Sequence, residues 1–141
     1  MTFPDPTPDA SNQPGPCGLR RFSGLDPAAY TIDYEIVGNL AIGGAISMEI
    51  RNGPPNAFHF ILVSPSPDEV PAPGTNLDIL VAPPFVPVVI LPSDPNGDLT
   101  LFFNVYANQA LIGFTAYMQV AAFDVSANLH LSNAVEARIC P

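Results

Sequence analysis

Apolar and polar residues alternate along most of this chain, as in β-strands that have one buried and one solvated face. In the segment 29–37, AYTIDYEIV, tyrosine and isoleucine fall on one face, and Thr31, Asp33 and Glu35 fall on the other. The segment 45–51, AISMEIR, repeats the pattern with isoleucine and methionine inward. Both segments therefore predict half-buried strands.

The same alternation, interrupted by turns, continues to the end of the chain. In AFHFILVS (57–64), we expect Phe58, Phe60 and Leu62 to form the buried face. Further strands are expected at 77–82, 85–91, 99–105, 111–123 and 129–139. Asn-Gly and proline-rich turns separate these eight or so strands, and none of them has the period of an amphipathic helix. The sequence thus predicts an all-β fold, a single antiparallel sandwich of immunoglobulin-like or jelly-roll type.

The positions of the 18 prolines predict an N-terminal arm, an edge strand and a central strand of a sheet. Five of them lie in the first 16 residues, which predicts an extended arm over 1–24 and a sandwich domain over 25–141. The proline-rich segment 64–76 is expected to be a polar loop. Pro87 lies inside a predicted strand, and because proline cannot donate to the ladder, that strand should be an edge. Leu111–Phe123 lacks proline and charge, so it should be a long central strand.

The charge of the chain excludes two classes of partner. It has 13 acidic residues, four arginines and no lysine, so its net charge is −9. Nucleic-acid binding needs a basic surface that neutralises phosphates, and anionic membranes attract basic segments. The uncharged stretches 79–93 and 99–123 are interrupted by prolines or by polar residues and glycine, which disfavours a spanning helix. We therefore expect neither nucleic-acid binding nor membrane insertion, and the sequence identifies no small-molecule ligand.

Four segments carry turn and strand patterns in a fixed order. They are GGAISMEIRNGPPNAFHFILVSPSP, DPNGDLTLFFNV, ALIGFTAYMQVAAFD and LSNAVEARI, with the patterns G-x-PPN, D-x-NG, L-x-G-x-x-x-Y-x-Q and LSN. In this order they resemble a β-sandwich module of secreted proteins from GC-rich environmental bacteria. The likeness covers about residues 30–139 and none of the arm. It implies a β-sandwich fold and secretion, and it implies no mechanism.

The two histidines lie in no sequence motif that indicates a metal site or a catalytic site. His59 lies opposite the phenylalanines of its strand, so we expect it to be exposed, and no spacing indicates zinc. Ser132, His130 and Asp124 have the composition of a hydrolase triad, but no nucleophile-elbow sequence accompanies them. We therefore expect no catalytic residues and no cofactor.

Asp94, Asn96 and Asp98 resemble the start of a calcium-binding loop. However, Gly97 is fourth rather than sixth in this segment, and apolar residues follow it. A turn is the favoured interpretation, and a weak calcium site is the alternative. The four tyrosines, without any tryptophan, are expected in the core or an interface rather than on a sugar-binding platform.

The arm and the lack of edge protection predict assembly. Soluble β proteins often protect edge strands with lysine, which this chain lacks. An extended arm can add a strand to a neighbour or lie in its groove. We expect a non-enzymatic, extracellular or cell-surface structural protein that self-assembles into a homo-oligomer or polymer, as a fibre or layer. The alternative is a monomeric glycan-binding or adhesion module. The residues expected at the interface are Phe3, Leu19, Arg20, Arg21 and Phe22.

One cysteine lies near each end of the chain, at Cys17 and Cys140, and no CxxC motif is present. The pattern predicts one disulfide in an oxidising compartment, either within a chain or between neighbouring copies. Two free thiols in a cytosolic protein are the alternative. The segment 1–12 has neither the basic nor the apolar part of a secretory signal. We therefore expect a signal that has been removed, or export by another route.

We predict that Cys17 and Cys140 are oxidised in the native protein. In the chain-entropy model, a bond that closes a loop of more than 100 residues stabilises the fold by about 4–5 kcal/mol. Intact mass after alkylation, with and without reductant, measures the oxidation state. Two alkylated thiols in the absence of reductant would contradict the prediction and indicate a reducing compartment.

Overall fold

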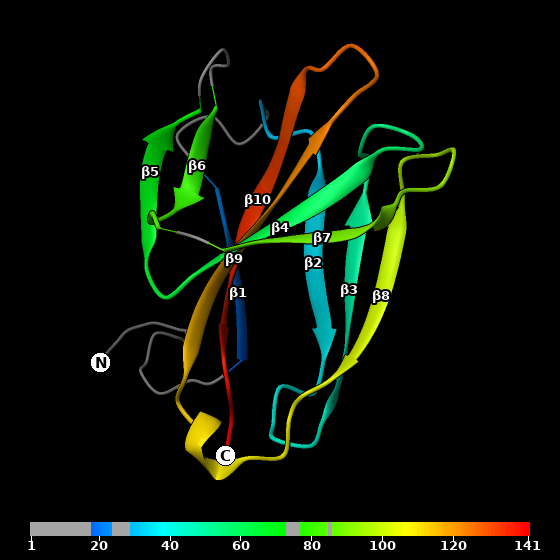
Figure 1. Ribbon diagram of the computed structural model, residues 1–141. Coiled ribbons are helices and arrows are strands. Elements are labelled where there is room, and N and C mark those ends of the chain that lie inside the picture. Colours follow the sequence, from blue (N-terminus) through cyan, green and yellow to red (C-terminus); the bar gives the residue numbers. More distant parts are fainter. Residues whose placement is uncertain (1–17, 24–28, 73–76, 85) are drawn as a thin grey trace, which may run out of the picture.

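The computed structural model describes residues 18–23, 29–72, 77–84 and 86–141, and it confirms the all-β fold. A five-stranded sheet packs face to face on a three-stranded sheet, and a small two-stranded sheet packs on the other face of the five-stranded sheet (Figure 1). No helix in this described part of the chain is long and apolar enough to cross a membrane.

All strand pairings between neighbours within the sheets are antiparallel. The five-stranded sheet has the order β1-β10-β9-β4-β7, and the three-stranded sheet has the order β2-β3-β8. The strands of the first are β1 (Gly18–Phe22), β4 (Phe58–Ser64), β7 (Val86–Pro92), β9 (Thr115–Phe123) and β10 (Leu129–Arg138). Those of the second are β2 (Asp33–Gly38), β3 (Ala45–Arg51) and β8 (Leu99–Asn104). The small sheet consists of β5 (Pro67–Pro71) and β6 (Asp78–Val81).

Two apolar clusters cover the two faces of the five-stranded sheet. The main core lies between it and the three-stranded sheet, and it includes Tyr34, Ile50 and Val120. The second cluster lies between its other face and the β5–β6 sheet, and it includes Leu62 and Leu131. Because β9 has β10 and β4 as neighbours and apolar layers on both faces, its middle residues are all buried. The predicted central strand is therefore confirmed.

That central strand begins later than the sequence pattern predicted. Gln109–Leu111 forms a short 3-10 helix, and the side chain of Asn108 caps it by accepting a hydrogen bond from the Ala110 amide at 2.9 Å. Gly113 then adopts a φ of 82°, and β9 starts at Thr115. The polar cap and the glycine keep residues 109–113 out of the strand, although apolar residues continue through this segment.

The predicted faces of β4 were wrong. His59 and Ile61 are buried, Leu62 belongs to the cluster under β5 and β6, and Phe58 is exposed. A strand that is covered on both faces carries apolar residues on both, so its sequence lacks the polar side from which orientation is inferred. His59 is therefore not the exposed strand histidine that we expected.

Two strands lie where an arm and a loop were expected, whereas the predicted edge is confirmed. β1 pairs with β10 from Gly18 opposite Arg138 onward, so residues 18–22 of the predicted arm belong to the sandwich, and residues 1–17 lie outside the described residues. β5 lies in the segment expected to be a polar loop. β7, which contains Pro87, pairs with β4 and with no other described strand.

Two five-residue turns are built in the same way. Asp94 and Asp124 each use Oδ1 to accept the backbone amides two and four residues ahead, at 2.8–2.9 Å. The fourth residue of each turn is left-handed, with a φ of 81° at Gly97 and 65° at Ala127. A Cβ at Gly97 would lie 1.9 Å from the carbonyl oxygen of Gly53, so glycine is required there. Ala127 instead retains the steric cost of this conformation.

We predict that Ala127→Gly raises the free energy of unfolding by about 0.5–1 kcal/mol, because glycine removes the left-handed steric cost. Gly97→Ala, at the equivalent position, should lower it by more than about 2 kcal/mol, since the backbone at Gly53 blocks the new methyl group. Chemical denaturation of the two variants measures both changes. Destabilisation by Ala127→Gly would contradict this interpretation of the turn.

Candidate assembly interface

A β-bulge in β10 lies at the side of the sandwich where the two sheets meet. The register with β9 shifts between Leu131 and Ala134, so Ser132 and Asn133 together face Val120. Ser132 Oγ accepts a hydrogen bond from the Val120 amide at 2.8 Å, which replaces a bond of the strand ladder. The extra residue also changes which face later side chains occupy, so the bulge controls the packing of the end of β10.

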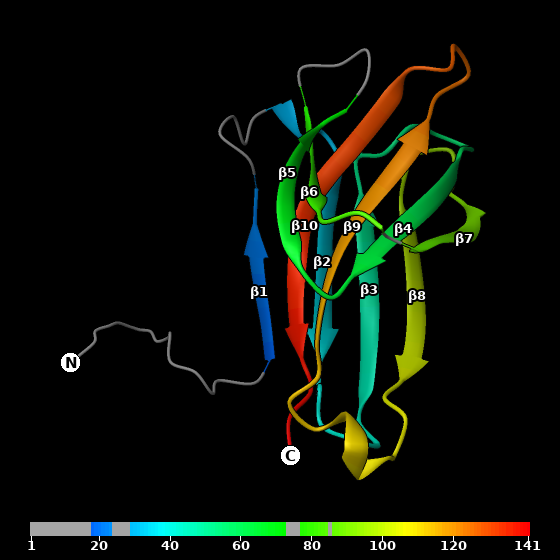
Figure 2. The same ribbon diagram turned by 60° about the vertical axis from the view of Figure 1, so that its left-hand side comes forward.

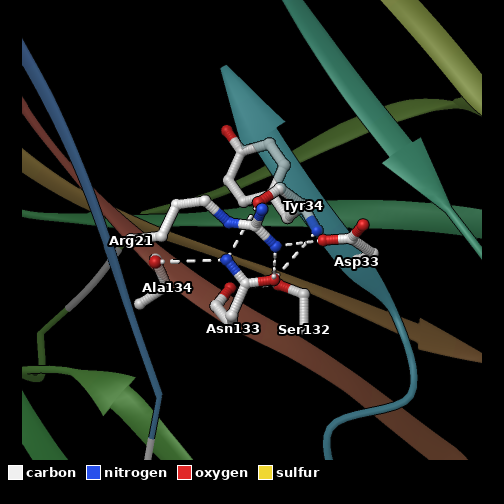
Figure 3. Close-up of polar contacts among 6 residues, drawn as sticks. All are labelled: Arg21, Asp33, Tyr34, Ser132, Asn133 and Ala134. Carbon is white, nitrogen blue, oxygen red and sulfur yellow. Dashed lines mark hydrogen bonds and ion pairs between the residues drawn. The ribbon is translucent and has the colours of Figure 1, made fainter. Parts of the chain in front are cut away.

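Asn133 binds the backbone of the opposite sheet. Its Oδ1 accepts from the Tyr34 amide at 2.9 Å, and its Nδ2 donates to the Tyr34 carbonyl at 2.8 Å (Figure 3). Arg21 from β1 donates to the carboxylate of Asp33 and lies 3.5 Å from Asn133 Oδ1. These contacts close the edge of β2 against β10.

Four of the five residues that were expected to contact a neighbour are used within their own chain. These four are Leu19, Arg20, Arg21 and Phe22, all in β1. Arg20 forms an ion pair with Glu136 of β10 at 2.5 Å, and Leu19 packs against the main core. β1 therefore supplies the partner that the edge of β10 needs, and the assignment of these four residues to an intermolecular interface stays a prediction. The fifth residue, Phe3, lies outside the described residues.

Of the three residues with the composition of a hydrolase triad, His130 and Asp124 lie together, and Ser132 does not contact them. His130 Nε2 lies 2.9 Å from Asp124 Oδ2, and this hydrogen bond, with those from backbone amides, lowers the pKa of Asp124 to about 2. His130 Nδ1 lies 3.4 Å from Thr31 Oγ1. Ser132 is buried, and its hydroxyl donates to the Asn133 carbonyl at 2.6 Å. The serine stabilises the bulge rather than facing the histidine.

The weak calcium candidate forms the turn that connects β7 to β8. Its residues are Asp94, Asn96 and Asp98, and both carboxylates accept backbone amides, Asp98 from Asn52 at 3.2 Å. No group of three or more His, Cys, Asp or Glu residues in the described chain is arranged to hold a metal ion. The turn interpretation accounts for the observed bonds, and calcium binding stays an untested alternative.

The described part of the chain brings the neighbourhoods of the two cysteines to one end of the sandwich. Gly18 follows Cys17 in sequence, and it pairs with Arg138, two residues before Cys140. The amide of Cys140 donates to the carbonyl of Leu40 at 3.0 Å. Cys17 lies outside the described residues, so the disulfide stays a prediction, and this register favours the form within one chain.

The side of the sandwich opposite β1 has an open edge. β8 pairs with β3 over its whole length, and no other described strand pairs with it. Figure 2 shows β8 and β1 on opposite sides of the molecule. Phe102 is 81% exposed and Phe103 is 45% exposed. An apolar strand edge without charge is a template for the addition of another strand.

An apolar cavity lies between the two sheets, beside the residues that follow β8 and β10. Its volume is about 280 Å³. Its walls include Ile46 of β3, Val105 after β8, Phe114, Met118 of β9 and Ile139 after β10. The open edge and this cavity together form the acceptor surface, by which we mean β8 and the cavity beside its end.

The phenylalanines of β8 were not among the expected interface residues. Consecutive residues of a strand point to opposite faces, so Phe102 and Phe103 necessarily place one ring on the outer face of the sheet. This signal was present in the sequence. The position of β8 at an edge depends on strand order, which alternation does not encode.

The chain shows no match to known proteins in any of the three comparisons. No family model, curated protein or solved structure matches it.

His59 is a buried histidine with one unsatisfied nitrogen. Nδ1 lies 2.8 Å from the Ala57 carbonyl, so the neutral ring donates from Nδ1, and Nε2 has no partner among the described residues. A Cβ on Gly53 would lie 2.3 Å from Nε2, so this glycine makes room for the ring. Burial lowers the pKa of His59 below its usual range, the Ala57 hydrogen bond opposes this, and the charge of His130 lowers it further.

We predict that stability falls as the pH drops below about 6.5, the usual histidine pKa. In this window the unfolded chain binds a proton that the folded His59 does not, so acid favours unfolding. Denaturation midpoints between pH 8 and pH 5 measure the effect, and His59→Gln should flatten it while His130→Gln retains it. The lowered pKa of Asp124 affects stability only below about pH 4, which separates the two groups. A wild-type midpoint that is constant from pH 7.5 to pH 5 would contradict this role.

Proposed function

We propose that this chain is an exported, non-enzymatic structural subunit that self-assembles into a fibre or layer through its arm and the open edge of its sandwich. The observation that carries the proposal is the free edge of β8, where Phe102 is 81% exposed. Monomeric β proteins protect such edges, and this strand has neither a charged residue nor a proline. Its free edge is explained if a strand of another copy pairs with it.

The asymmetry of the sandwich supports an open assembly rather than a closed dimer. Asn133 binds the edge of β2 at Tyr34, whereas no such contact protects the edge of β8, so β8 is the more open edge of the three-stranded sheet. A contact between an arm and a different surface is heterologous, and heterologous contacts form filaments when the rotation between copies does not close a ring. The cysteine pattern and the resemblance to a secreted module support an extracellular site.

The second candidate is a monomeric glycan-binding or adhesion module. The exposed rings of Phe102 and Tyr106 favour it, because flat exposed aromatic rings can stack on sugars. The two functions differ in oligomeric state, which the same sample can report.

We predict that the native protein forms species whose mass grows with concentration, measured by light scattering. Phe102→Asp should suppress this growth, because it places a charge on the acceptor edge. Val125→Asp is the matched control, since Val125 is 100% exposed at the tip of the β9–β10 turn and lies on no edge. A wild-type protein that stays monomeric at high concentration would contradict self-assembly and favour the binding module.

A further inference from the structure

The positions of the prolines limit which edge of the arm can pair with another strand. All five prolines in residues 1–17 lie at even positions. They are Pro4, Pro6, Pro8, Pro14 and Pro16. In an extended strand, the backbone N–H groups of alternate residues point to opposite edges, and proline has no N–H to donate. The even edge of the arm therefore lacks most of its donors, whereas the odd edge retains all of them.

If the arm is extended, these prolines allow it to pair with another strand along one edge only. Phe3, Asp5 and Thr7 each precede a proline, which restricts them to extended conformations, and each proline has its φ fixed near the extended range. The segment 3–9 is thus biased toward the bound shape before it binds, which lowers the entropic cost of ordering. Its length is close to that of β8, which has six residues.

The side chains of the same segment divide into two faces. The proline rings at even positions lie on one face, and Asp5, Thr7 and Asp9 lie on the other. The side chains of β8 also divide into two faces. Leu99 and Leu101 pack against the main core, and Thr100 and Phe102 are exposed on the other face. A strand laid along β8 would place its proline rings on the side of Leu99 and Leu101, and its polar residues on the side of Thr100 and Phe102.

We propose that residues 3–9 of one copy add to the free edge of β8 in a second copy, as a one-sided strand whose prolines lie on the core-facing side of the sheet. This inference rests on the proposed self-assembly and identifies the site at which it occurs. The odd residues supply the N–H and C=O groups that pair with β8. The proline edge then faces outward and prevents a further strand from adding beside it.

The starting position of the arm favours a neighbouring copy as the source of the strand, and its length allows it to reach one. The described chain begins at Gly18, at the start of β1, whereas β8 lies on the opposite side of the sandwich (Figure 2). An extended arm of 17 residues spans about 50 Å at 3.1 Å per residue, which exceeds the size of a domain of this length. Each copy then offers one arm and one acceptor surface, so the contact propagates in one direction.

The test uses two full-length variants that each add one proline to the arm, at an odd position inside residues 3–9 and at an even position just beyond them. Thr7→Pro removes an N–H from the pairing edge, and Ala10→Pro removes one from the edge that already lacks donors. We expect Thr7→Pro to raise the concentration needed for half-assembly about tenfold, equivalent to about 1.4 kcal/mol, and Ala10→Pro to leave it unchanged. Hydrogen exchange of the β8 amides should slow on assembly of the wild type and of Ala10→Pro, but not at the same concentration of Thr7→Pro.

Each other outcome overturns the inference in a distinguishable way. If the wild type assembles and both variants behave alike, the one-sided strand is wrong while self-assembly stands. If the β8 amides are protected in a monomer at all concentrations, the chain's own arm covers the edge. If the wild type is monomeric and the β8 amides exchange freely, both the proposed function and the site assignment fail.

Discussion

The two sheets are joined on one side through Asn133, whose amide group bonds to both backbone groups of Tyr34. Two paired strands normally exchange such a pair of backbone hydrogen bonds. Here the side chain of Asn133 takes the place of one strand and connects the two sheets. The contact is possible because the bulge at Ser132 and Asn133 turns this side chain away from the ladder of its own sheet. Closure of β2 against β10 thereby leaves the opposite edge, β8, as the exposed margin of the three-stranded sheet.

The upper corner of the sandwich in Figure 1 is closed by the two turns through which the chain passes between the sheets. The amide of Gly53 donates to the carbonyl of Gly97 at 2.9 Å, and the hydroxyl of Ser93 donates to the carbonyl of Pro54 at 2.7 Å. His59 lies against Gly53 in this corner, which explains why a histidine occupies a buried position.

The sequence predicted the fold class and the strands that have one apolar and one polar face. It did not predict the orientation or existence of strands in which burial or function removes the alternation of apolar and polar residues. The inward faces of β2 and β3 follow from alternation, and Pro87 marks an edge because proline has no donor. His59 was misplaced because β4 is apolar on both faces. β1 was missed because Leu19–Phe22 has two adjacent arginines, whose ion pairs with Glu136 and Asp33 depend on residues distant in sequence. The acceptor surface was likewise not predictable, since it depends on which strands lack neighbours.

The central claim is that the arm of one copy lies along β8 of another, and an isotope-mixed sample tests it most directly. Equal amounts of subunits labelled with ¹³C and subunits labelled with ¹⁵N would be assembled together and examined by solid-state NMR for contacts between the two labels. The account predicts intermolecular contacts between residues 3–9 and the amides of Leu99–Asn104. Assembled material in which the amides of β8 show no contact with the arm of another copy would contradict it.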